Sequence, residues 1–241
     1  MTTPAPAEKA PSVFEDLLEI FISPTAVFER RRETPAFGLA LVILIVLMVG
    51  LTFAFKDLMS PLLDAEFDRG MQQAMKQNPN LTPEMLQQGR AIGEKFMVVG
   101  VGLYALVAPI VTGIVLWFAA KLLESSAQLG QAIMVAVYAM FPRVVESIAG
   151  AIQLLVLPEG GINGRYSLSL GPARFLDPDT ANPLLLAVLG RVDLITIWVV
   201  VLLAIGIWVM GKIPRSRAAI AAVVAWIIGT LPAVWGALRA M

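Results

Sequence analysis

The sequence predicts an all-α membrane protein, a polytopic bundle of five transmembrane helices. Of its 241 residues, 58% are hydrophobic and only 15% are charged, and the mean hydropathy is +0.78. A soluble domain of this length needs more polar surface than this composition supplies. The chain also contains five apolar runs close to the roughly 20 helical residues that cross a hydrocarbon core about 30 Å thick.

The five predicted spans cover residues 35–56, 96–120, 130–157, 192–211 and 217–238, with boundaries good to a few residues. Three of them contain a proline, which removes a backbone hydrogen bond and is expected to kink the helix: Pro109, Pro142 and Pro232. Several spans also contain glycines, whose small size favours close helix packing: Gly100, Gly102, Gly113, Gly206 and Gly229.

Residues 1–34 are predicted to form a cytoplasmic tail followed by interfacial amphipathic helices. Residues 1–11 are rich in proline and alanine and are expected to be disordered. Apolar residues then recur at helical spacing between Phe14 and Ile22. Either this helix packs on the bundle, or it lies on the membrane surface while basic residues contact anionic lipid headgroups: Arg30, Arg31 and Arg32.

Residues 57–95 are predicted to form an extramembrane helical hairpin between the first two spans. A turn signal occurs at residues 78–80, and Thr82-Pro83 then restarts a helix that runs into the second span. A stripe of apolar residues recurs every four positions: Leu63, Phe67, Met71 and Met75. This stripe is either a partner-binding surface or the seam between the two hairpin helices.

Residues 158–191 form a predicted loop that ends in a short interfacial helix. The alternation in residues 166–170 is compatible with a small β-hairpin, and Asn182-Pro183 is a helix-start signal. Asp177 and Asp179 are interpreted as solvated loop residues, and no metal site is predicted.

A pair of opposite charges stands near the centre of the third predicted span. Arg143 and Glu146 follow Pro142 directly, and their i,i+3 spacing places them on one helix face. Because each charge costs about 2.5–3.5 kcal/mol at the centre of a membrane helix, both should face the bundle. The pair is either a polar site for a lipid headgroup, ion or proton, or a structural ion pair that satisfies the carbonyl freed by Pro142.

Composition also limits the chemistry of this chain. It contains no cysteine and no histidine, which removes thiol nucleophiles, Cys/His metal sites and the usual general base near neutral pH. The sequence shows no hydrolase, metalloprotease or phosphate-loop motif, so we predict no enzymatic activity and no cofactor. The net charge is zero, so nucleic acid is not an expected partner.

The distribution of lysine and arginine predicts the orientation. Basic residues are dense before the first span and between the fourth and fifth spans, and Lys121 closes the second. Basic residues in short loops favour the cytoplasmic side. We therefore expect a cytoplasmic N-terminus and, with five spans, a C-terminus on the opposite side of a bacterial inner membrane.

Four stretches of the chain resemble the Yip family of five-span membrane proteins, in its bacterial branch. They are FEDLLEIFISPTAVFE, SAQLGQAIMVAVYAMFPRVVESI, RVDLITIW and GKIPRSRAAIAAVV. The resemblance implies a cytosolic N-terminus and homo- or hetero-oligomers. Eukaryotic members bind Rab-type GTPases in vesicle traffic, but their DLYGP-like motif is absent here. The resemblance assigns no specific biochemical activity to bacterial members of the family.

These features predict a non-enzymatic scaffold or membrane-organising protein that acts through membrane lipids and a protein partner or a second copy of itself. The alternative is a permease, ion pathway or lipid transporter that uses the site at Arg143 and Glu146. A solvated cavity that reaches this pair would favour transport, and a dry, tightly packed pair would favour the scaffold.

Overall fold

The computed structural model describes residues 12–78, 80–158, 162 and 164–239. The tail predicted for residues 1–11 lies outside these residues. Within them every regular element is helical, with two short 3₁₀ turns, η2 (Arg165–Leu168) and η3 (Pro172–Phe175). The α-helices are α1 (Val13–Glu19), α2 (Pro24–Arg30), α3 (Gly38–Ala54), α4 (Ser60–Gln77), α5 (Pro83–Leu122), α6 (Leu129–Ala139), α7 (Pro142–Val156), α8 (Pro183–Leu189), α9 (Leu194–Gly211) and α10 (Arg215–Arg239).

The predicted class, an all-α membrane protein, is confirmed at this level. In the part of the chain that is described, four helical segments are long and apolar enough to cross a bilayer: α5, the α6–α7 pair, α9 and α10. Helix α3 is also apolar, but its 17 residues lie at the lower limit for a spanning helix. The count of five spans therefore stays a prediction.

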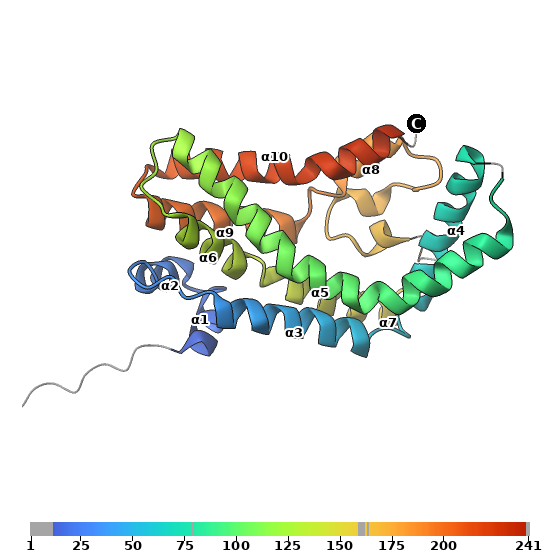
Figure 1. Cartoon of the computed structure of the whole chain (residues 1–241), viewed down its shortest axis with the longest axis horizontal. Coiled ribbons are helices and arrows are strands. Elements are labelled where there is room, and N and C mark those ends of the chain that lie inside the picture. The colour runs from blue at the N-terminus through green and yellow to red at the C-terminus, as the bar shows by residue number, and fades with distance from the viewer. Residues whose placement is uncertain (1–11, 79, 159–161, 163, 240–241) are drawn as a thin grey trace, which may run out of the picture.

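The 40-residue helix α5 is the longest element of the bundle (Figure 1). Its C-terminal part packs against α3, α6 and α10, while α9 packs against α10, α6 and α2. Figure 1 shows α1 and α2 at one end of the molecule and α4, with the N-terminal part of α5, at the other. The predicted continuity from the Thr82 helix start into the second span is confirmed, since the Thr82 side chain caps α5 at Met85 N–H.

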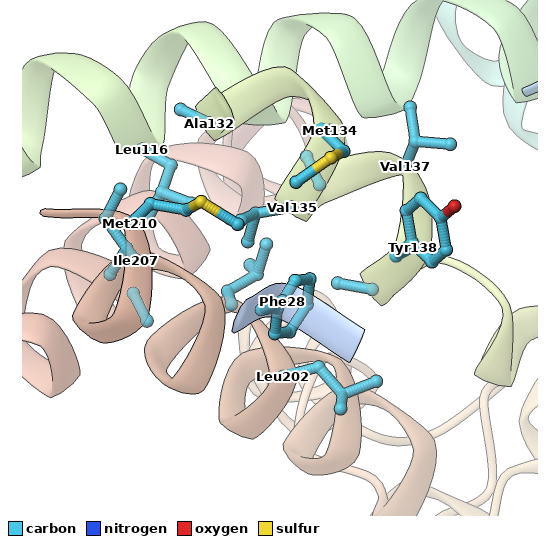
Figure 2. Close-up of a cluster of buried hydrophobic side chains, with 14 of the residues drawn as sticks. Phe28, Leu116, Ala132, Met134, Val135, Val137, Tyr138, Leu202, Ile207 and Met210 are labelled. Atoms are coloured by element: carbon cyan, nitrogen blue, oxygen red, sulfur yellow. The ribbon is translucent and has the colours of Figure 1, made fainter. Parts of the chain in front are cut away.

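A cluster of fully buried side chains lies where α6, α9 and α2 meet. Phe28, Val135, Tyr138 and Ile207 are fully buried there, and Figure 2 shows Phe28 of α2 beside Leu202 and Val135. The side chains labelled in Figure 2 come from α2, α5, α6 and α9, which are distant in sequence. The core therefore fixes α2 to the bundle.

Two glycines explain how closely the helices approach. A Cβ built on Gly113 of α5 would lie 2.5 Å from Cα of Ile133 in α6, and one on Gly206 of α9 would collide with Val135. Small residues at such positions let helix backbones approach closely. Gly100 and Gly229 differ, because a Cβ there would meet nothing within 4 Å.

The third predicted span is interrupted. Helix α6 ends at Ala139 and α7 begins at Pro142, with Met140 and Phe141 between them. Proline is well suited to the first turn of a helix, where its missing N–H has no intrahelical partner. Helices α5 and α10 are instead continuous through Pro109 and Pro232.

The possible β-hairpin at residues 166–170 is wrong, because the structure has the 3₁₀ turn η2 there. The turn is closed by Ser167 N–H donating to Gly164 O at 3.1 Å and by Ser169 N–H donating to Tyr166 O at 3.0 Å. Gly164 has a φ of +85°, which turns the chain in a way that a strand cannot. The helix start at Asn182 is confirmed, since its side chain caps α8.

Candidate functional site

The N-terminal helices α1 and α2 are joined by a buried carboxylate. Asp16 is fully buried and accepts hydrogen bonds from Arg30 Nη2 at 2.7 Å and Arg31 Nε at 2.6 Å. Arg30 also pairs with Glu19. Burial lowers the pKa of Arg30, but hydrogen bonds and attraction from Asp16 and Glu19 leave that pKa above its ordinary value. Arg30 therefore stays charged and holds the two helices together.

Of the two alternatives for this segment, the structure shows packing on the bundle for its inward face. Ile20, Val27 and Phe28 are fully buried, and Phe21 packs edge-on against Trp198 of α9. The opposite face is an exposed apolar stripe: Phe14, Leu18 and Ile22. Arg32 differs from its two neighbours, because its backbone carbonyl accepts from Gln131 of α6. A lipid-headgroup contact for the three arginines stays a prediction.

The stripe predicted on the hairpin lies partly between α4 and α5. Phe67 and Met71 line a pocket of about 350 Å³ shared with Arg90 and Ala91 of α5. Arg90 stacks over the Phe67 ring at 4.9 Å and pairs with Asp64 of α4 and Glu94 of its own helix.

The outer end of the same stripe is open. Leu63 is half-buried, whereas Met75 is exposed. Met85 and Ile92 of α5 are exposed as well. The stripe is therefore partly buried between α4 and α5 at Phe67 and Met71, and it is exposed at Met75.

Arg143 and Glu146 lie on the first turns of α7, beside α9. Arg143 Nη1 donates to Glu146 Oε2 at 2.7 Å, and Arg143 Nη2 donates to Thr196 Oγ1 at 2.9 Å. Thr196 in turn donates to Asp193 Oδ2 at 2.6 Å, and Asp193 caps the N-terminus of α9. One arginine thus links the starts of two helices.

The carbonyl freed by Pro142 is satisfied in another way than the sequence suggested. Tyr138 O accepts a hydrogen bond from the backbone N–H of Phe141 at 3.3 Å. Because the backbone supplies this donor, the Arg143 guanidinium is left to bind Glu146 and Thr196. Pro142 itself is buried and positions the first turn of α7.

A cavity of about 1460 Å³ reaches the Arg143–Glu146 pair. Its walls come from the ends of α3 and α10, from one face of α7 along most of its length, from α4, and from the segment that runs from η2 to the first turn of α9. The Arg143 side chain is 23% exposed and that of Glu146 is 41% exposed, so Glu146 is the more open of the two. The buried core around Tyr138 and Leu202 fills the bundle on the other side of the break between α6 and α7.

An ion pair and a hydrogen bond join α4 to the loop across the rim of this cavity. Arg69 Nε donates to Asp179 Oδ1 at 2.6 Å, and Arg165 N–H donates to Glu66 Oε1 at 2.8 Å. Gly164 lies against Arg69 and Glu66 so closely that a Cβ would collide with both. Among the described residues, no group of three or more carboxylates, histidines or cysteines is arranged to hold a metal ion.

Comparison with known proteins decides the family. The family model for the Yip1 domain matches residues 18–236. The chain belongs to the Yip1 domain family. No curated protein and no solved structure matches it. The Yip1 domain thus includes α2, all or most of every helix of the bundle and all of the residues that line the cavity except Ala237. Together with the apolar helices, this makes the chain a multi-pass integral membrane protein.

Three residues of this Yip1 domain protein were missed by sequence reasoning: Asp16, Thr196 and Gly164. Asp16 occurs four residues before the apolar Ile20, so both lie on one helix face. That spacing was the available signal for its burial. Thr196 and Gly164 act through contacts between segments far apart in the chain, which no local pattern reports.

Proposed function

We propose that this Yip1 domain protein is a non-enzymatic scaffold that organises other proteins in the membrane through the α4–α5 hairpin. The observation that carries this proposal is the exposed end of the apolar stripe between α4 and α5. The two helices are held by Arg90, while Met75 is 41% exposed and Met85 is 55% exposed. Flexible methionine side chains adapt well to a partner surface.

Helix α4 offers a different surface on its other side. Gln73 and Lys76 line the large cavity, whereas Phe67 and Met71 line the pocket toward α5. One helix therefore separates a polar face from an apolar one, and a partner that binds the seam would not need to enter the cavity. We propose that the exposed stripe of α1 and the turn after it, formed by Phe14, Leu18 and Ile22, lies against membrane lipids.

A permease is the less favoured function. The cavity reaches Arg143, which is the condition that favours transport, but Val135, Tyr138 and Leu202 belong to a continuous buried core and not to the cavity lining. A cavity that does not extend through this core fits a binding site better than a pathway across the bundle. Transport would instead need this core to separate.

Photocrosslinking tests the scaffold. A photoreactive amino acid at Met75 should give a discrete protein adduct in native membranes. The same group at Gln73 should not, because Gln73 is also exposed but faces the cavity. An adduct of twice the chain mass would identify a homo-oligomer. Equal adducts at both positions, or none at Met75, would contradict the proposal, as would substrate flux in liposomes that Glu146→Gln abolishes.

A further inference from the structure

The large cavity is lined by a balanced set of charges. Among the described residues that line it, five are basic and five are acidic. A cavity lined in this way creates no field that attracts a ligand of one net charge. It favours a ligand that carries both charges at separate atoms.

The charges at the rim already bind one another. Arg69 bonds Asp179, and Glu66 pairs with both Arg69 and Arg165. The pair that faces the deep part of the cavity is Arg143 and Glu146, which stands halfway along the α6–α7 segment. A charged pair in the middle of an apolar helical segment is stabilised further where a solvated cavity or a polar ligand replaces the lost water.

The geometry of this pair suits a zwitterion. Guanidinium groups are the preferred partners of phosphate, because their donors match its oxygens. Thr196 holds the Arg143 guanidinium from the side, and Arg143 occupies only one oxygen of Glu146 among the bonds seen in the described chain. The 41% exposed carboxylate of Glu146 therefore remains open to an ammonium group next to a phosphate on Arg143.

Apolar side chains complete the cavity. Leu51 and Phe55 of α3, Leu154 of α7 and Pro232 of α10 line the same space as the charged pair. Such a mixed lining accommodates an alkyl chain beside a polar headgroup. A free headgroup would leave these apolar walls without a partner.

We propose that the cavity binds a zwitterionic aminophospholipid, with its phosphate on Arg143, its ammonium group on Glu146 and an acyl chain along α3, α7 and α10. This site is independent of the scaffold role, so the failure of one test leaves the other proposal standing. Binding requires no chemical change in the lipid.

Titration of the full chain in detergent tests the site. Three probes are compared. Dihexanoylphosphatidylethanolamine carries a phosphate, an ammonium group and acyl chains, and dihexanoylphosphatidylglycerol carries the phosphate and acyl chains without the ammonium group. Glycerophosphoethanolamine carries the phosphate and the ammonium group without acyl chains. We expect the first to bind at least tenfold more tightly than either of the others. Equal binding of phosphatidylglycerol would overturn the zwitterion, and equal binding of glycerophosphoethanolamine would show that a free phosphoester, not a lipid, is the ligand.

Substitution then tests the residues. Glu146→Gln should weaken phosphatidylethanolamine binding by roughly tenfold to a hundredfold, the value of one charge-assisted hydrogen bond. It should not weaken phosphatidylglycerol binding, because Arg143 remains charged. Glu94→Gln is the matched control, because Glu94 also pairs with an arginine of its own helix but lies outside the cavity. Unchanged phosphatidylethanolamine binding by folded Glu146→Gln protein would refute the assignment.

Discussion

At the scale of single residues, the protein depends on charges placed where water is scarce. Asp16 is fully buried and holds Arg30 and Arg31, and Arg143 holds Glu146 and Thr196. Breaking a buried ion pair costs more than the pair itself contributes, because the remaining charge loses its compensation. Each cluster joins two segments that are separate in sequence.

Asp16→Asn should loosen the contact between α1 and α2. The two arginines would keep their charge beside a neutral amide, and because both are partly exposed we expect a loss on the order of 3 kcal/mol, the lower end for a broken buried pair. Thermal denaturation in detergent should show a lower midpoint, and limited proteolysis should cleave faster near α2. Glu29→Gln removes the same charge at an exposed position of α2 and should change neither measurement.

The sequence allowed one of these two clusters to be predicted. Arg143 and Glu146 interrupt an apolar run, so their charge alone indicates a site inside the bundle. Asp16 lies among other charged residues, where an acidic side chain is normally exposed, and its spacing from Ile20 is only a weak sign of burial. Its bonds to Arg30 and Arg31 depend on how α1 and α2 fold against each other, which local sequence does not report.

At the scale of elements, helix ends were more predictable than the contacts between helices. The Thr82 and Asn182 caps mark the starts of α5 and α8 through side chains that bond the first turn. The β-hairpin predicted at residues 166–170 is wrong because alternating polar and apolar residues are a weak signal over five positions. The positive φ of Gly164 determines a turn there instead. Among the glycines of the spans, the sequence could not separate Gly113, at a helix contact, from Gly100, which faces open space.

Gly113→Ala should therefore destabilise the bundle, and Gly100→Ala should not. The new methyl group at Gly113 would meet the backbone of Ile133 at 2.5 Å, and a backbone cannot move aside as a side chain can. Overpacking of this kind costs about 1–3 kcal/mol. The midpoint of thermal denaturation in detergent should fall for Gly113→Ala alone; equal midpoints for the two variants would mean that α5 and α6 are not in close contact.

At the scale of the whole molecule, the bundle has a dense half and a hollow half. The dense half contains the core around Phe28 and Ile207, and the hollow half contains the cavity that reaches Arg143. The charges differ between the two ends in the same way. Lys121, Lys212 and Arg215 lie at the dense end, where two of them stack on tryptophans, whereas the charges around the cavity balance one another.

This asymmetry predicts the orientation of the protein. Basic residues in short loops stay on the cytoplasmic side, so the dense end should be cytoplasmic and the cavity should open on the other side.

The chain has no cysteine, so a single introduced cysteine can be labelled without background. Lys56 follows α3 and Lys212 follows α9, and both are exposed. In intact cells made permeable only in the outer membrane, a membrane-impermeant maleimide should label Lys56→Cys at once and Lys212→Cys only after the inner membrane is lysed. Labelling of both positions from the same side would show that α3 does not cross the membrane as predicted, and reversed labelling would place the cavity in the cytoplasm.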